Sequence, residues 1–155
     1  MGNRAVVCFA NEDEVVPFRK DGVEALHGFV AVNHYRVGVY LHWNGGRDSI
    51  EAFCKACKDA GFRGPVSDDY GVARFVQTVC NFIGVDSGLS VGVNTLAHLD
   101  CDNGDNGVYV VDDDWQIVGR EFAHGEQRAY DVDDFVTELL ALMERVKEAC
   151  KVGSK

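Results

Sequence analysis

The sequence contains no long apolar run, no internal repeat and no low-complexity linker. A membrane-spanning helix needs about 18 to 20 apolar residues, and no run approaches that length. The N-terminus also lacks the basic and apolar pattern of a signal peptide, so we expect a soluble, cytoplasmic protein without membrane contact. A chain of 155 residues with 46% hydrophobic residues can bury one ordinary core. We predict one domain over residues 1–150 and a frayed tail over residues 151–155.

Basic residues are scarce, since 15 Lys and Arg oppose 25 Asp and Glu and leave a net charge of −10. An acidic surface repels phosphates, so we expect no direct nucleic-acid binding and regard a basic groove on another protein as the natural complement. The excess is concentrated in residues 100–134, where 11 acidic residues accompany 2 basic ones. Acidity that serves solubility alone remains an open alternative.

The six cysteines are irregularly spaced and give no disulfide framework. Cys54 and Cys57 form a CxxC motif, to which His98 and Cys101 could add zinc ligands. Both motif cysteines fall on the apolar stripe of a predicted helix, so we expect them in the core. The loop over residues 100–107 carries oxygen ligands suited to calcium but lacks the glycine and glutamate of an EF-hand loop, so we expect tight turns there. We predict no metal and no cofactor.

Periodicity predicts both strands and helices, together with a loop over the charged residues 12–22. The expected strands cover Ala5–Phe9, Phe29–Val32, 36–43, 89–93, Val108–Val111 and 115–119, and the last two form a hairpin. One helix is capped by Asp48 with Glu51 as its capping-box partner and ends at Gly61. Further helices cover 68–84 and begin at Asp131. This order predicts an α+β fold, with a single antiparallel or mixed sheet covered by about three helices.

The junction between the third strand and the first long helix carries the most informative side chains: His42, Trp43, Asn44 and Arg47. Gly45 and Gly46 let a ligand or partner approach the backbone, which favours recognition. His42 is a weak candidate for a general acid or base, because histidine titrates near neutral pH. No matched nucleophile is visible, because Ser49 lies in the helix and Cys8 in a core strand. The catalytic residues are therefore unknown, and binding is favoured over catalysis, although the alternation predicts that Trp43 shares a face with the core aliphatics of its strand.

Several segments together resemble a group of small uncharacterised proteins from phages and integrated mobile elements. The resemblance rests on Met1-Gly2-Asn3-Arg4 and Tyr40-Leu41-His42-Trp43-Asn44-Gly45, and extends through residues 100–107 to Val118-Gly119-Arg120-Glu121. No activity is established for the group, so the resemblance implies no catalytic residue. Small acidic proteins of such elements often resemble inhibitors of host defence, and this analogy implies an anti-CRISPR-like role.

These observations predict an acidic binding protein that inhibits or sequesters a host factor by presenting an acidic face to a basic groove. The expected binding residues are Arg4, His42, Trp43, Asn44, Arg47, Asp100, Asp102, Asp105, Asp112, Asp113 and Asp114.

The alternative is a small-molecule or nucleotide-signal binding protein, or a small hydrolase, built around His42, Trp43 and Asn44. This alternative needs a pocket, and it needs Arg4 near the end of the 36–43 strand. A third possibility, an assembly subunit without independent activity, would show a large apolar patch and stable self-association.

Overall fold

The computed structural model describes residues 2–19, 24–83 and 90–122, together with residues 141, 144, 145 and 148. Its centre is a mixed five-stranded sheet in the order β3-β2-β1-β4-β5, in which β1 and β4 are parallel and the other pairs antiparallel. The strands are β1 (Ala5–Phe9), β2 (Val37–Leu41), β3 (Val91–Thr95), β4 (Val108–Val111) and β5 (Ile117–Glu121). The predicted α+β fold with a single sheet is confirmed.

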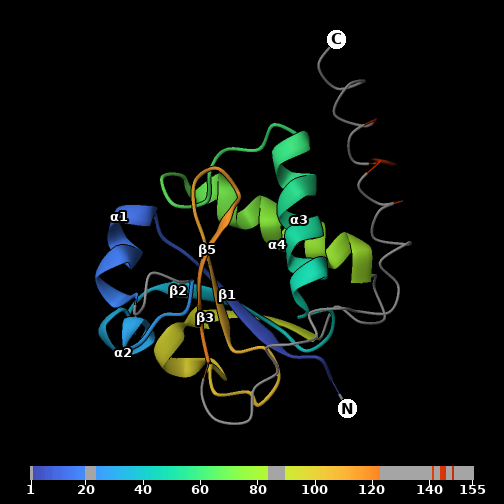
Figure 1. Cartoon of the computed structure of the whole chain (residues 1–155). Coiled ribbons are helices and arrows are strands. Elements are labelled where there is room, and N and C mark those ends of the chain that lie inside the picture. The colour runs from blue at the N-terminus through green and yellow to red at the C-terminus, as the bar shows by residue number, and fades with distance from the viewer. Residues whose placement is uncertain are drawn as a thin grey trace.

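Helices cover both faces of this sheet, with α3 and α4 on one side and α1 and α2 on the other (Figure 1). In the described part of the chain the helices are α1 (Glu12–Val15), α2 (Phe29–Val32), α3 (Arg47–Asp59) and α4 (Asp69–Ile83), with the 3-10 turns η1 (Val16–Phe18) and η3 (Leu96–His98). The loop expected over residues 12–22 thus begins with α1 and η1. None of these helices is both long and apolar enough to cross a membrane.

The central strand β1 is buried on both faces, which explains its continuous apolar run. Ala5, Val7 and Phe9 belong to the core under α3 and α4. Val6 and Cys8 belong to a second core on the opposite face. The sheet therefore separates two apolar clusters, and each cluster fixes the helices above it.

The larger core is organised by aromatic side chains of the two long helices. The ring of Phe75 in α4 lies edge-on to Phe53 of α3 at a centroid distance of 6.4 Å. It also stacks on Trp115 in the β4–β5 turn at 6.3 Å. Burying one such side chain contributes about 1.5 to 3 kcal/mol, so these contacts join both helices firmly to the hairpin.

The CxxC motif belongs to this core, as predicted from its position on the apolar stripe of the helix. Cys54 and Cys57 are buried on the face of α3 that packs against the core. Burial raises the pKa of both thiols, that of Cys57 to about 12, against a weaker opposing hydrogen bond with Thr78. Both thiols therefore stay protonated and unreactive at neutral pH.

The predicted strand over Phe29–Val32 is wrong, because these residues form the single helical turn α2. Gly28 precedes it with a φ of 82°, and the carboxylate of Glu121 accepts the backbone N–H of Phe29 at 2.8 Å. The N–H of Val30 donates to the same carboxylate at 3.3 Å. A partner distant in the sequence thus satisfies the first N–H groups of this turn, which a short apolar run cannot reveal.

The predicted cap of α3 is also wrong, because Gly46 is the N-cap residue and the helix begins at Arg47. Asp48 lies in the first turn and accepts the N–H of Ser49 at 2.8 Å, while Glu51 pairs with Arg47. The predicted end at Gly61 is confirmed by its φ of 74°. The N–H groups of Gly61 and Phe62 return to the last turn of α3, as in a Schellman motif.

The predicted β4–β5 hairpin is confirmed, although its second strand begins at Ile117. Trp115 lies in the turn with a φ of 61° instead of starting the strand. The strand predicted over 36–43 ends at Leu41, and the one predicted over 89–93 covers Val91–Thr95. The helix predicted from Asp131 and the tail over 151–155 lie outside the described residues, apart from the helical positions 141, 144, 145 and 148.

Candidate functional site

One end of the sheet brings together segments that are far apart in the sequence. Strand β1 begins there, antiparallel β2 ends there, parallel β4 begins there, and β5 ends there. We call this region the motif end and define it as residues 2–4, 42–46, 100–107 and 120–121. The pairing of the strands therefore gathers the N-terminus, the His42 junction and the acidic loop.

Hydrogen bonds of the N-terminus hold the His42 junction in place. The backbone N–H of Asn3 donates to the carbonyl of His42 at 2.9 Å, and the N–H of Gly45 donates to the carbonyl of Asn3 at 2.8 Å. Asn106, fully buried, donates its side-chain amide to the Asn3 side chain and to the carbonyl of Arg4. The junction is thus tied to both the N-terminus and the acidic loop.

Arg120 extends this network beneath the start of α3. Only 4% of the residue is exposed, and its guanidinium donates to the carbonyl of Asn106 at 3.2 Å and to the Tyr109 hydroxyl at 2.8 Å. The Tyr109 hydroxyl donates onward to the carbonyl of Gly45 at 2.7 Å. The guanidinium carbon lies 4.1 Å from the Tyr109 ring centroid and 4.5 Å from that of Phe122. Cation–π contacts and hydrogen bonds together offset the desolvation of this charge.

Asn103 organises the acidic loop from its centre. Its side-chain oxygen accepts the backbone N–H groups of Asp105, Asn106 and Gly107 at 3.0 to 3.1 Å. Its amide nitrogen donates to the carbonyls of Asp100 and Gly107. Gly104 and Gly107 have φ values of 76° and 65°, which glycine adopts without strain. Among the described residues, no group of His, Cys, Asp and Glu is placed to hold a metal ion.

Arg4 neutralises part of the acidic loop. Its Nε lies 2.7 Å from Asp105, its backbone N–H donates to the same carboxylate at 3.0 Å, and its Nη1 lies 3.8 Å from Asp100. Burial acts to raise the pKa of Asp105, but the bonds from Arg4 outweigh it and lower that pKa. The Asp100 side chain remains 51% exposed, and Asp102 is also exposed. Asp100 and Asp102 are therefore available to a partner, whereas Asp105 is engaged.

His42 lies between Tyr40 of β2 and the N-terminal segment. Its Nδ1 lies 2.8 Å from the Tyr40 hydroxyl, and a side chain at Gly2 would place its Cβ 2.8 Å from Nε2. Burial raises the pKa of Tyr40, with nearby Arg4 opposing this shift. Arg4 therefore lies at the end of β2, as the small-molecule alternative requires. Ser49 and Cys8, which the sequence does not support as nucleophiles, are both fully buried.

Trp43 and Asn44 form the turn between β2 and α3. Trp43 is 41% exposed and follows the end of the strand, so the prediction that it shares a face with core aliphatics is wrong. Its ring lies edge-on to His42 at 5.2 Å. Asn44 has a φ of 57°, which asparagine tolerates better than most residues, and its amide lies 3.5 Å from the Ser49 hydroxyl. Asn44 shapes the turn, and the turn presents Trp43 at the surface.

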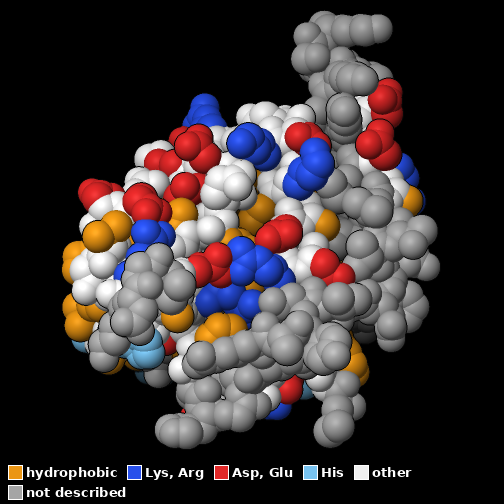
Figure 2. Space-filling model, viewed as in Figure 1, with side chains coloured by type: hydrophobic (Ala, Val, Ile, Leu, Met, Phe, Trp, Pro, Cys, Tyr) orange, Lys and Arg blue, Asp and Glu red, His pale blue; other side chains and the backbone are white. Residues whose placement is uncertain are grey.

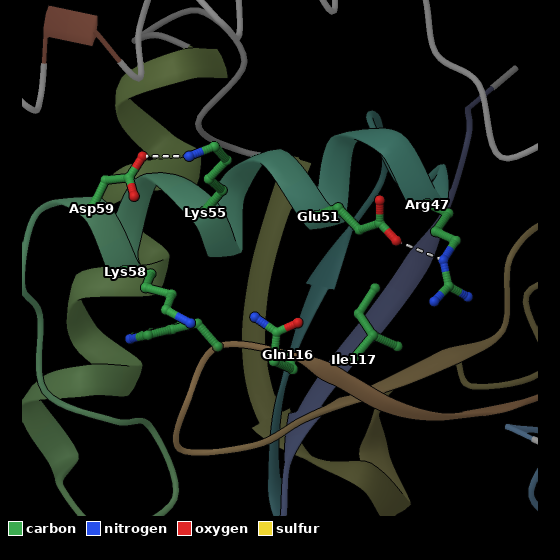
Figure 3. A pocket seen from close by; sticks show the side chains of 8 residues that line it. Arg47, Glu51, Lys55, Lys58, Asp59, Gln116 and Ile117 are labelled. Carbon is green, nitrogen blue, oxygen red and sulfur yellow. Dashed lines mark hydrogen bonds and ion pairs between the residues drawn. The ribbon is translucent and has the colours of Figure 1, made fainter.

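Arg47 points away from this group, to the side of α3 that faces β5. It pairs with Glu24 and Glu51, and these carboxylates raise its pKa against the effect of burial. It lines a groove of about 540 Å³ together with Glu51, Lys55, Lys58, Asp59, Trp115, Gln116 and Ile117. Figure 3 shows the helix residues along one side of the groove, opposite Gln116 and Ile117. The structure therefore brings Arg4 to His42 but separates Arg47 from both.

The remaining predicted acids lie at the other end of β4, in the turn of the hairpin. Asp112 accepts the N–H groups of Asp114 and Gln116 at 2.9 Å. Asp113 accepts those of Val66 and Ser67 at 2.8 and 3.0 Å, while Asp114 is exposed. Strand β4 thus separates the acids of residues 112–114 from those of residues 100–105.

The described acids therefore do not form one continuous face. On the face that carries α3, Figure 2 shows acidic and basic side chains interspersed. The acids of residues 123–134 lie outside the described residues.

Fold and site together define the protein as an α+β protein with a mixed sheet and a buried, hydrogen-bonded polar cluster at one end of that sheet. Comparison of the chain with protein-family models, with curated proteins and with solved structures gives no match. Its function has to be inferred from the geometry of its residues.

The sequence pattern does not predict the three buried residues that hold the site together, namely Asn103, Asn106 and Arg120. The Asn-Gly pairs predicted turns but not the burial of their side chains. Arg120 lies in β5, one residue beyond the strand predicted over 115–119, and nothing local in the sequence indicates that its side chain turns inward.

Proposed function

We propose that the protein is a cytoplasmic binding protein without catalytic activity. It inhibits or sequesters a host factor by placing its acidic motif end against a basic groove, in an anti-CRISPR-like manner and without direct nucleic-acid contact. The observation that carries this proposal is the buried hydrogen-bond network, which fixes an exposed tryptophan at the same end of the sheet as two exposed carboxylates.

Rigidity of the junction supports binding. The backbone around Trp43 is held by the bonds of Asn3 to His42 and Gly45, so little conformational entropy remains to be lost when a partner binds. Tryptophan is enriched among the residues that dominate binding energy at interfaces. Trp43 therefore supplies the main apolar contact in this proposal.

The exposed carboxylates of Asp100 and Asp102 supply charge complementarity. Exposed charges at the rim of an interface accelerate association and set its salt dependence more than they set affinity. Asp112 and Asp113 are poor candidates for this role, because their carboxylates already accept backbone N–H groups of the turn. The proposal therefore places the acidic contribution at the motif end and leaves the hairpin turn out.

The test begins with capture of the partner from a host lysate on the immobilised protein, followed by binding measurements with the purified partner. Trp43→Ala is expected to weaken binding by about 2 kcal/mol, roughly thirtyfold in Kd. The double variant of Asp100→Asn and Asp102→Asn is expected to slow association and flatten its salt dependence.

Two matched variants serve as controls for these measurements. Asp114→Asn removes an exposed charge from the hairpin turn, and Tyr70→Ala removes an exposed aromatic ring from α4. Both are expected to bind as the unchanged protein does. An Asp114→Asn effect larger than that of the Asp100 and Asp102 pair, or full binding by Trp43→Ala, would contradict the proposal.

A small-molecule function at the same end is the second candidate, favoured by the position of Arg4 near Tyr40 and His42. Tyr40→Phe removes the hydroxyl that contacts His42 while leaving Trp43, Asp100 and Asp102 in place. A small-molecule or hydrolase function predicts altered ligand binding or turnover in this variant. The proposed inhibitor predicts unchanged affinity for its protein partner.

A further inference from the structure

A second, smaller pocket lies where α3 ends and α4 begins, away from the motif end. Its volume is about 360 Å³, and it is lined by Gly61, Phe62, Arg63, Tyr70 and Arg74. The lining thus consists of two arginines, two aromatic side chains and a glycine, with no carboxylate among these described residues. Such a lining is unexpected in a chain whose net charge is −10.

Local structure explains how this lining is assembled. The Schellman turn at Gly61 reverses the chain after α3, which brings Phe62 and Arg63 to the start of α4. Asp68 caps α4 by accepting the N–H of Tyr70 at 2.8 Å. Tyr70 and Arg74 are one helical turn apart and share a face. The pocket is therefore built on two helix ends.

Each guanidinium is held over an aromatic ring. The Cζ atom of Arg63 lies 5.1 Å from the Tyr70 ring centroid, and that of Arg74 lies 5.7 Å from the Phe62 centroid. Stacking of this kind orients a guanidinium while its N–H groups at the edge remain able to donate. Both arginines are thus oriented before any ligand arrives.

The charges of these arginines are only partly balanced by the contacts they make. Arg63 donates to the Asp68 carboxylate at 3.1 Å, and Arg74 donates to the neutral Gln77 amide oxygen at 3.0 Å. Each of these bonds uses one of the five N–H donors of a guanidinium. Among the described residues, these contacts thus set one carboxylate against two positive charges, and that carboxylate does not line the pocket.

We propose that this pocket binds a small ligand that carries an oxyanion, phosphate or carboxylate, beside a flat ring. The oxyanion is bound by Arg63 and Arg74, because a guanidinium matches the geometry of two acceptor oxygens. The ring packs on Tyr70, which is 62% exposed. The volume lies within the range of small-molecule sites. This site is independent of the binding surface at the motif end.

The test is an NMR titration of the ¹⁵N-labelled full chain with AMP, benzoate, inorganic phosphate and adenosine. AMP or benzoate is expected to shift the amide signals of residues 61–63 and 70–74 in a saturable manner, and the stronger of the two identifies phosphate or carboxylate as the preferred oxyanion. Inorganic phosphate lacks the ring and adenosine lacks the oxyanion, so each is expected to bind at least tenfold more weakly.

Three variants locate the binding. Arg74→Gln and Arg63→Gln are each expected to weaken binding of the stronger probe about tenfold, because each removes a charge-assisted bond. Lys58→Gln removes one positive charge from the neighbouring groove and is expected to have no effect. Well-dispersed spectra confirm that the variants are folded. If Arg74→Gln does not fold, Arg63→Gln at an exposed position still tests the proposal.

The proposal is overturned if neither AMP nor benzoate gives saturable shifts at the lining residues. It is equally overturned if folded Arg74→Gln and Arg63→Gln bind as the unchanged protein does, or if Lys58→Gln weakens binding as much as they do. Inorganic phosphate that binds as tightly as AMP would overturn the assignment of a ring-bearing ligand.

Discussion

The two ends of the β4–β5 hairpin hold their carboxylates in different ways. In the turn, Asp112 and Asp113 accept backbone N–H groups from their own turn and from the segment before α4. At the motif end, Asp105 pairs with Arg4, and Glu121 packs against the first turn of α2. Acidic residues that are close in sequence therefore have different roles. The net charge of a segment does not equal the charge that its side chains expose to a partner.

Asp113 in the turn and Glu121 at the motif end also differ in the direction in which folding shifts their pKa. Burial acts to raise the pKa of Asp113, but hydrogen bonds from Ser67 and Val66 outweigh it and lower the pKa. For Glu121, burial outweighs the bonds from Val30 and Phe29, so the pKa is raised. Asp113 is thus stabilised as an anion, whereas Glu121 is held in a place that disfavours its charge.

Asn103→Ala is expected to have the largest effect on stability, because the Asn103 side chain makes five hydrogen bonds within the acidic loop. Its removal takes the acceptor away from the N–H groups of Asp105 and Gly107 and should lower the free energy of unfolding by about 3 kcal/mol. Urea unfolding provides the measurement. Asp102→Ala in the same loop is the control, with an expected change within about 0.5 kcal/mol, and equal midpoints for both variants would contradict the prediction.

Asp113→Ala should test the other end of the hairpin with an intermediate effect. It removes the acceptor for the N–H groups of Val66 and Ser67 and should cost about 1 to 2 kcal/mol at pH 7. Because the pKa of Asp113 is lowered by folding, its stabilisation is present above the unfolded pKa of about 3.9 and is lost as pH falls through the folded value. Unfolding at pH 7 and pH 3 should therefore show a smaller difference from the unchanged protein at the lower pH. A stability difference between the variant and the unchanged protein that does not depend on pH would refute a contribution from the charge of Asp113.

Glu121→Gln should produce the smallest effect and the opposite pH dependence. Since the pKa of Glu121 is raised by folding, the unchanged protein loses stability as pH rises from about 4.3 through the folded value. Glutamine keeps an acceptor for Phe29 without the charge, so the variant should match the unchanged protein at pH 4 and exceed its Tm slightly at pH 7. Thermal unfolding across this range gives the comparison, and parallel curves for the two proteins would refute it.

Periodic segments could be predicted from the sequence, and segments held by distant partners could not. The apolar pattern of α3 and α4 continues over several turns, and β1 and the β4–β5 hairpin stand out as short apolar runs. The turn at Phe29 depends on Glu121, which is 92 positions away in the chain. A local pattern contains no information about such a distant partner, so the apolar run predicts a strand where the chain forms a helical turn.

The candidate site shows the same division. The position of His42 and Trp43 at a strand-to-helix junction could be predicted, because the strand pattern stops there and glycines follow. The burial of Asn106 and Arg120 could not be predicted, because their partners are backbone carbonyls, the Asn3 side chain and the Tyr109 hydroxyl, which the pairing of strands brings close. Arg47 shares the junction in sequence, but the direction of its side chain along α3 takes it to a different groove.

The hydrogen bonds of the motif end also affect the deamidation of its Asn-Gly pairs. Asn44, Asn103 and Asn106 each precede a glycine, and such pairs lose ammonia when the glycine nitrogen attacks the side-chain carbonyl. Here the nitrogen of Gly45 is bound to Asn3, and that of Gly107 is bound to Asn103. Attack at these two pairs requires the bonds to open, so their deamidation is expected to be slowed in proportion to the small fraction of molecules in which this end of the sheet is locally open. The hydrogen bonds that shape this surface thus also protect two of its Asn-Gly pairs from deamidation.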